Sequence, residues 1–231
     1  MNTLQWALGI GLAFTLASFA ADLARGQEAE AKPKDEKPSQ PKLEEATFGG
    51  GCFWCTEAFF ERLPGVKSVV SGYSGGGVPN PTYQMVSTGL TGHAEVIQIT
   101  FDPAVIPFAT LLDYFWAAHD PTTVNAQGPD HGTQYRSIIL YHSDAQKEAA
   151  EKAKHALNAR RVHKSPVVTQ IEPFETFYPA EGYHQDFARS NPGHPYVQTY
   201  IVPKMHKLKK IMKAEAQKEA EAQAGEEAES K

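Results

Sequence analysis

Cysteine is nearly absent from this sequence, which contains only Cys52 and Cys55 among its 231 residues. Two thiols cannot cross-link a disulfide-rich scaffold, nor supply the four ligands of a cysteine-only zinc site. The chain also lacks an excess of basic residues, because 27 acidic and 22 basic side chains leave a net charge of −5. Nucleic-acid-binding domains normally show the opposite balance, so we expect no nucleic-acid partner.

Residues 1–21 lack charged side chains and are almost entirely apolar or small. The small residues around Ser18-Phe19-Ala20 are typical of a signal-peptidase site, so we predict a signal peptide cleaved near Ala20 or Ala21. No Lys or Arg precedes the apolar run, although signal peptides usually have one there. A membrane anchor is the alternative, because the run is just long enough to cross a bilayer. A buried core helix is a third reading, disfavoured because a linker follows. We therefore expect an exported protein, periplasmic or anchored facing the periplasm.

Residues 22–45 contain few large apolar side chains and many Glu, Lys, Ala, Pro and Gln residues, which predicts a disordered linker. Residues 204–231 form a charged C-terminal tail in which Leu208, Ile211 and Met212 give one amphipathic turn. We interpret this tail as a solvated, partly helical extension, with contact to a partner or membrane surface as the alternative. The remaining residues, 46–203, are predicted to form one catalytic domain.

Within that domain the pattern of apolar residues predicts strands that alternate with helices. Strands are expected at 46–50, 66–73, 95–101, 135–141 and 167–171. Helices are expected at 52–62, 81–89 (as a helix or turn), 107–119, 180–189 and after the N-cap Ser143 to about Arg161. The connections are too irregular for a doubly wound parallel sheet. We predict an α+β fold, a two-layer α/β sandwich with a mixed sheet and a ferredoxin-like core.

The most informative stretch is Gly49-Gly50-Gly51-Cys52-Phe53-Trp54-Cys55. Three glycines let the backbone turn sharply, and Cys52 then falls where a strand gives way to a helix. The free N–H groups and dipole at a helix N-terminus stabilise a thiolate, so we expect a lowered pKa for Cys52 and a role as nucleophile. The alternative is a buried cysteine that acts as a small apolar residue.

The C-x-x-C spacing by itself indicates a thioredoxin-like redox motif. The aromatic pair Phe53-Trp54 between the cysteines is larger and more apolar than the residues usual in such motifs. Next to a nucleophile, this pair fits a pocket for an apolar group of the substrate, such as a methyl. Ordinary core packing is the alternative for both rings.

Gly51-Cys52-Phe53-Trp54 resembles the active-site motif of the peptide methionine sulfoxide reductase A family. The resemblance extends over about residues 47–200 and includes several further motifs in order: Gly72-Tyr73-Ser74-Gly75-Gly76, Asn80-Pro81-Thr82-Tyr83, Gly92-His93-Ala94-Glu95-Val96, Phe115-Trp116, His119-Asp120-Pro121-Thr122, Gln127-Gly128-Pro129-Asp130, Gly132-Thr133-Gln134-Tyr135-Arg136-Ser137 and Tyr178-Pro179-Ala180-Glu181-Gly182-Tyr183-His184-Gln185. It implies a peptide-methionine (S)-S-oxide reductase that repairs oxidised methionine in proteins, with free methionine sulfoxide as a second candidate substrate.

The resemblance also implies roles for individual residues. Reduction of a sulfoxide requires a thiolate that attacks sulfur while the oxygen is protonated, and Glu95 matches the family's general acid. A carboxyl group among apolar and aromatic residues has the raised pKa that this role needs. Tyr83 and Tyr135 match the hydroxyls that polarise the S–O bond.

Asp130 matches a residue that orders hydrogen bonds and water in the family's site, and Phe53 and Trp54 match the walls that hold the methionine methyl. His184 and Tyr183 lie in a matching stretch but receive no catalytic step. The nine histidines form no compact ligand pattern, so we predict no metal and no bound cofactor.

This chain departs from the commoner family pattern at position 55, where Cys55 stands in place of glycine and no cysteine follows. After attack, Cys52 becomes a sulfenic acid, and Cys55 is the only internal thiol that could resolve it as a disulfide. Residues i and i+3 share a helix face, which permits the bond. Direct reduction of Cys52 by an external thiol is the alternative. The resemblance implies thioredoxin, or a similar exported dithiol protein, as reductant.

Two other functions remain open at the level of sequence. A periplasmic thiol–disulfide oxidoreductase would use the same C-x-x-C but would not depend on Glu95. A non-catalytic binding module would retain methionine sulfoxide without turnover. The partners we expect are oxidised proteins and the dithiol reductant, and we expect a monomer.

Overall fold

The computed structural model describes residues 42–229. The predicted signal peptide or anchor, 1–21, and most of the predicted linker lie outside this range. Among the residues described, no helix is both long enough and apolar enough to span a bilayer.

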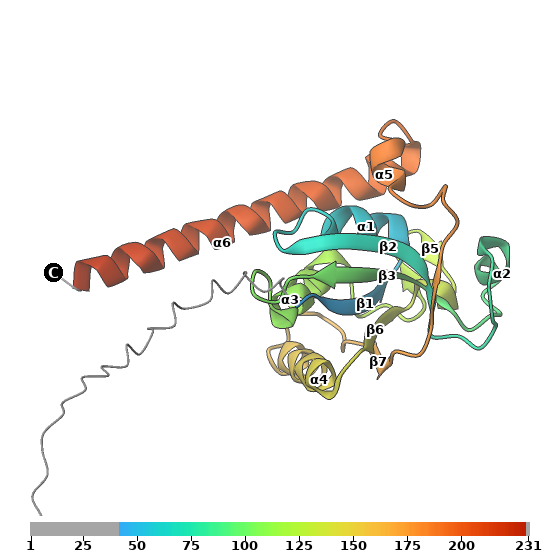
Figure 1. Ribbon diagram of the computed structural model, residues 1–231, viewed down its shortest axis with the longest axis horizontal. Coiled ribbons are helices and arrows are strands. Elements are labelled where there is room, and N and C mark those ends of the chain that lie inside the picture. Colours follow the sequence, from blue (N-terminus) through green and yellow to red (C-terminus); the bar gives the residue numbers. More distant parts are fainter. Residues whose placement is uncertain (1–41, 230–231) are drawn as a thin grey trace, which may run out of the picture. The chain divides into compact units, whose positions relative to one another are not determined.

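Six strands form the main sheet, in the spatial order β7-β6-β1-β3-β2-β8. They comprise β1 (Glu44–Gly50), β2 (Val66–Ser74), β3 (Ala94–Phe101), β6 (Ser137–Tyr141), β7 (Gln170–Pro173) and β8 (Phe177–Pro179). Only the β6–β7 pair is parallel, so the sheet is mixed. A separate small hairpin pairs β4 (Ala126–Gln127) with β5 (Asp130–His131). Figure 1 shows β2, β3, β1, β6 and β7 side by side in that order.

The four central strands confirm the predicted ferredoxin-like core. Strand β3 lies between β1 and β2 and is antiparallel to both, so β1 and β2 are parallel to each other. A parallel pair needs a crossover connection, which the helix α1 (Phe53–Phe60) supplies. Strand β6 then pairs antiparallel with β1 on its other side. The turn from β1 into this crossover helix carries both cysteines.

The remaining helical segments are α2 (Tyr83–Ser87), α3 (Phe108–Ala118), a 3₁₀ turn η1 (Thr133–Tyr135), α4 (Asp144–Ala159), α5 (Phe187–Ser190), a π-helical turn η2 (Val197–Ile201) and α6 (Val202–Glu229). The predicted cap of α4 is confirmed, because the hydroxyl of Ser143 accepts a hydrogen bond from the backbone N–H of Gln146 at 3.3 Å.

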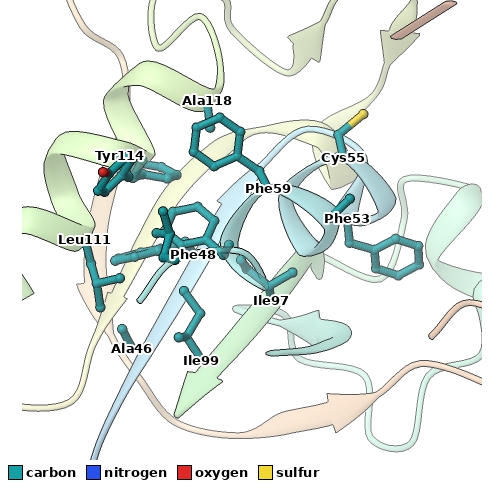
Figure 2. Packing of buried hydrophobic residues seen from close by; sticks show 14 of the residues in the cluster. Ala46, Phe48, Phe53, Cys55, Phe59, Ile97, Ile99, Leu111, Tyr114 and Ala118 are labelled. Carbon is teal, nitrogen blue, oxygen red and sulfur yellow. The ribbon is translucent and has the colours of Figure 1, made fainter. Parts of the chain in front are cut away.

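Aromatic and branched side chains fill the space between the sheet and its helices. Phe48 of β1 stacks on Phe115 of α3 with ring centroids 4.9 Å apart, and Ile97 and Ile99 of β3 are fully buried. Figure 2 shows Phe59 of α1 directed toward α3, while Cys55 projects from the other end of the same helix. The helix is therefore anchored by its C-terminal turns, which leaves its first turn free to build a site.

Three predicted elements differ from the structure. The strand expected at 135–141 begins only at Ser137, because Thr133–Tyr135 form η1. The strand expected at 167–171 lies at Gln170–Pro173, and the helix expected at 180–189 shortens to α5. Strand β8 and the hairpin β4–β5 were not predicted. Each misplaced segment is short and takes its conformation from neighbours distant in sequence, which apolar periodicity does not reveal.

The backbone stays helical through the predicted domain boundary at Pro203. Helix α6 continues without a break, and Leu208 is 2% exposed in the main core, where Met205, Ile211 and Met212 also pack. Glu215 accepts a hydrogen bond from the hydroxyl of Tyr114 in α3. The predicted charged tail, 204–231, thus begins as part of the folded domain, and only its later turns extend beyond these contacts (Figure 1).

Candidate active site

Cys52 is the N-cap residue of α1, at the point where β1 turns into the helix. Gly51 makes this turn with φ +91°, and a side chain there would also meet Gln127 at 2.6 Å. Glycine is therefore required on two grounds at this position. The Cys52 side chain is 8% exposed and is a free thiol. The predicted location at a strand-to-helix junction agrees with the structure.

Glu95 of β3 faces the first turn of α1. Its Oε2 accepts a hydrogen bond from the backbone N–H of Phe53 at 3.1 Å, and the residue is 3% exposed. Burial raises the pKa of Glu95 to about 8, against a smaller opposing effect from the Phe53 N–H. At neutral pH the carboxyl group is therefore mostly protonated, the state that a general acid requires.

The expected lowering of the Cys52 pKa is wrong for this arrangement. Burial raises the pKa of Cys52, and the hydrogen bond with Cys55 and the charge of Glu95 act in the same direction. The pKa of Cys55 is instead lowered to about 7, first by the hydrogen bond with Cys52, against burial, and also by the charge of Lys204. The two thiols therefore titrate as a coupled pair.

Tyr83 and Tyr135 come together from α2 and η1. Burial raises the pKa of both phenols, and the charges of Glu95 and Cys52 raise both further. The two half-buried tyrosines are therefore close enough to the carboxyl group and the thiol to feel their charges, and both hydroxyls remain protonated donors at neutral pH. The structure thus brings Tyr83, Tyr135, Glu95 and Cys52 into one electrostatic cluster, as the resemblance implied.

Asp130 of β5 lies on the Cys55 side of this cluster. Its Oδ2 accepts a hydrogen bond from the Tyr196 hydroxyl at 2.6 Å, and the Cys55 thiol donates to the same hydroxyl oxygen at 3.8 Å. A small cavity of about 60 Å³ opens here, lined by Cys52, Cys55, Gln127, Gly128, Pro129, Asp130, Tyr196, Tyr200 and Lys204. The resolving candidate and the nucleophile candidate thus share one cavity.

The aromatic pair of the motif has unequal surroundings. Phe53 is 1% exposed, and its ring lies 5.0 Å from that of His184. Trp54 is half-buried, stacks on Phe187 with centroids 3.7 Å apart, and donates its indole N–H to Nδ1 of His184 at 3.1 Å. Neither ring lines the small cavity beside the thiols, and their role as methyl-binding walls stays a prediction.

Three site neighbours were not identified from sequence as functional. Tyr196 precedes η2, Phe187 begins α5, and His184 stands between Trp54 and Tyr83, whose ring centroid is 4.4 Å away. Glu181, three residues before His184, accepts hydrogen bonds from the Tyr73 hydroxyl and the Tyr83 backbone N–H and so links this segment to β2 and α2. The motif around His184 was the only sequence signal, because the hydrogen bonds that the side chains of these residues make join positions 66 or more apart in the chain.

Among residues 42–229, no group of three or more His, Cys, Asp or Glu side chains is arranged to hold a metal ion. The chemistry available to the described cluster is that of two thiols, one protonated carboxyl group and two phenols.

The family model described as peptide methionine sulfoxide reductase matches residues 44–217, which is most of the chain. A peptide methionine sulfoxide reductase MsrA from Polynucleobacter asymbioticus is 51% identical over 174 residues, covering 75% of this chain and 92% of that protein. An MsrA from Sulfolobus acidocaldarius is 58% identical over 168 residues, covering 73% and 94%.

The solved structure of Mxr1 from Saccharomyces cerevisiae in reduced form is also similar to this chain. Its TM-score is 0.62 at 38% identity, with coverage of 66% of this chain and 87% of that chain. The residues matched by the family model include the junction of β1 and α1 and the start of α6, so that match covers the whole described site.

Proposed function

Since the chain belongs to the peptide methionine sulfoxide reductase family, whose members reduce methionine sulfoxide and so repair oxidised proteins, we propose that Cys52 is its nucleophile and Glu95 its general acid. One observation carries the assignment: Glu95 is buried, has a pKa of about 8 and bonds to the backbone N–H that follows Cys52. A proton donor thus stands beside the candidate thiol at neutral pH.

The first step transfers one oxygen atom. The sulfur of Cys52 attacks the sulfoxide sulfur and forms an S–S bond while Glu95 protonates the oxygen. The S–S and S–O bonds of this intermediate then break as the hydroxyl group passes to the Cys52 sulfur, and the proton of the Cys52 thiol replaces the one that Glu95 donated. The products are methionine and a sulfenic acid on Cys52, so the thiol is oxidised by two electrons and the sulfoxide is reduced by two. Tyr83 and Tyr135, both protonated, donate hydrogen bonds to the oxygen as its charge develops.

Trp54 and Phe53 supply the apolar surface for the methionine methyl in this proposal. The stacking of Trp54 on Phe187 and its hydrogen bond to His184 fix the indole plane, which a methyl-binding wall requires. Asp130 acts through Tyr196, whose hydroxyl it holds beside Cys55.

Cys55 resolves the sulfenic acid in the second step. Its sulfur attacks the Cys52 sulfur, an S–S bond forms, and the hydroxyl leaves as water. A thioredoxin-type dithiol then reduces the Cys52–Cys55 disulfide and returns both thiols. The support is structural proximity: Cys52 and Cys55 line the same cavity, and the electrostatics of each thiol depend on the other.

Free thiols counted after one equivalent of a methionine sulfoxide peptide test both steps. We expect methionine in stoichiometric amount and no free thiol in the wild type, and no methionine from Cys52→Ser. Cys55→Ser should complete one round but lose turnover with thioredoxin. Full activity of Cys52→Ser would contradict the nucleophile, and unchanged thioredoxin-driven turnover of Cys55→Ser would contradict resolution by Cys55.

The alternative thiol–disulfide oxidoreductase uses the same cysteines but has no use for a buried, protonated Glu95. The match to the reductase family over residues 44–217 also disfavours it. Disulfide exchange on a dithiol substrate that is insensitive to Glu95→Gln would be the result in its favour.

We also propose that the enzyme is exported and monomeric. The uncharged apolar segment 1–21 and the small residues at its end support export. Fractionation of cells and mass spectrometry of the N-terminus test this, with a mature chain beginning near Asp22 as the expected result. A cytoplasmic chain that keeps Met1 would contradict it, and light scattering tests the monomer.

A further inference from the structure

A single cation stands beside the two thiols, and it comes from a segment that the sequence placed outside the catalytic domain. Lys204, in the first turn of α6, lines the same small cavity as Cys52 and Cys55. It is half-buried. Among the residues that the structure describes, Lys204 makes neither a side-chain hydrogen bond nor an ion pair. Its charge therefore faces the cavity without a carboxylate partner.

The backbone explains how Lys204 reaches this place. Tyr196, Tyr200 and Lys204 are spaced four residues apart along one continuous helical segment, and all three line the cavity. The π-helical turn η2 lies between the first and the last of them. Turns of this kind are rare and often occur at functional sites. Ile201 and Leu208, one turn before and one turn after Lys204, are both buried and hold the segment in the core.

The groups that face Cys55 come from four directions. They are Cys52 at the N-cap of α1, Glu95 of β3, Asp130 of β5, and Tyr196 and Lys204 of the C-terminal helical segment. Of these described groups, Lys204 alone is positive. Asp130 is bonded to the Tyr196 hydroxyl, and Glu95 is mostly protonated at pH 7. The charge that can stabilise an anion on Cys55 is thus that of Lys204.

We propose that Lys204 is a positioning residue for the recycling step, where it holds Cys55 as the thiolate that attacks the Cys52 sulfenic acid. This inference rests on the proposed role of Cys55. In the step, the Cys55 thiolate forms the S–S bond, and the hydroxyl of the sulfenic acid takes up one proton and leaves as water. Lys204 takes no part in the first step, in which Cys52 attacks the sulfoxide.

A quenched-flow experiment on the full chain separates the two steps. Enzyme is mixed with one equivalent of a methionine sulfoxide peptide between pH 5.5 and 9.5, and samples are quenched with an alkylating reagent. Methionine formed reports the first step, and loss of alkylated Cys55 reports the disulfide. The variants are Lys204→Met, which removes the charge at similar length, Lys204→Arg, which keeps it, and Lys210→Met as a matched control on an exposed position of the same helix.

In the wild type we expect the disulfide step to accelerate with pH around the midpoint at which Cys55, facing Lys204 in the shared cavity, loses its proton. Loss of one neighbouring positive charge should raise this midpoint by about one pH unit. Well below both midpoints, Lys204→Met has about one tenth of the wild-type fraction of Cys55 thiolate, but its more basic thiolate is about threefold more nucleophilic. The disulfide step should therefore be about threefold slower in Lys204→Met than in the wild type. Well above both midpoints it should be about threefold faster, and the two profiles cross.

A structural defect cannot produce this crossing, because it slows the step at every pH. Superimposed profiles for wild type and Lys204→Met, or a uniform loss without a change of midpoint, overturn the inference. So does a failure of Lys204→Arg to restore the profile, or an equal shift in Lys210→Met. Absence of any Cys52–Cys55 disulfide in the wild type instead refutes recycling by Cys55, and the inference falls with it. If Lys204→Met does not fold, Lys204→Gln makes the same comparison.

Discussion

Replacement of Glu95 by glutamine tests the general acid with little change in shape. The amide oxygen of Gln can still accept the hydrogen bond from the Phe53 N–H, which is 3.1 Å long in the wild type. The amide has no acidic proton, so Glu95→Gln removes proton donation and keeps the packing. General acids typically contribute a factor of about 10² to 10⁴, and we expect kcat/KM for a methionine sulfoxide peptide to fall by about that factor at pH 7.

The pH dependence gives the sharper test. With a pKa of about 8, Glu95 is about 90% protonated at pH 7 and about 10% protonated at pH 9. The ratio of the wild-type rate to the Glu95→Gln rate should therefore fall about tenfold between these two values.

The first round of methionine release, measured by rapid quench, is the assay, because it does not depend on reductant or product release. Glu151→Gln, on an exposed position of α4, is the matched control and should behave as wild type. A Glu95→Gln rate within threefold of wild type at pH 7 would refute the reasoning. A ratio that stays constant from pH 7 to pH 9 would show that some other group supplies the proton.

Three further predictions concern stability and the aromatic wall. Because burial raises the folded-state pKa of Glu95 from 4.5 to about 8, its stabilising contribution is complete below pH 4.5 and is lost as pH rises to 8. In urea unfolding, the free energy of unfolding of Glu95→Gln should rise relative to that of the wild type by about 1.4 kcal/mol for each pH unit in that window. Plots of unfolding free energy against pH that run parallel for the two proteins would contradict this prediction. Leu208→Ala should lower the free energy of unfolding by about 2–5 kcal/mol, whereas Lys209→Ala should change it by less than about 0.5 kcal/mol. Trp54→Phe loses the hydrogen bond to His184 and should reduce kcat/KM by up to about tenfold, mainly through KM; an unchanged KM would show that the indole N–H has no role.

The order of strands and helices was readable from the sequence where apolar periodicity was strong. Strand β3, helix α3 and the Ser143 cap of α4 lie where the pattern predicts them, because their local signals are strong. Strand β3 is a mostly apolar run, α3 has apolar residues at helical spacing, and serine is a preferred N-cap residue. The segments after Pro166 were harder, since β7, β8 and α5 are short. Strands β7 and β8 are held by pairing with β6 and β2, and α5 by the stacking of Phe187 on Trp54. Local pattern carries little information about such elements.

The end of the domain was misplaced for a different reason. Leu208, Ile211 and Met212 were recognised as one amphipathic turn, but the charges around them indicated a solvated tail. The structure shows that this turn packs in the main core, where few apolar residues suffice because α1 and α3 supply the rest of the surface. The average composition of residues 204–231 is polar, but individual residues such as Leu208 are buried, and an average over the segment does not reveal them.

The sequence by itself determined which reactive groups belong to the proposed site. They are Cys52, which follows three glycines at a strand-to-helix turn, the carboxyl group of Glu95, and two tyrosines in recognisable motifs. These are local signals, since each motif places a reactive group beside the glycines or prolines that shape its backbone. Only the tertiary structure decided the electrostatics. Burial raises the pKa of Cys52, which the helix N-terminus was expected to lower, and the cation beside Cys55 arrives from α6, 149 positions along the chain. The pKa of a thiol depends on its desolvation and on every charge within a few ångströms, and neither can be known before the chain has folded.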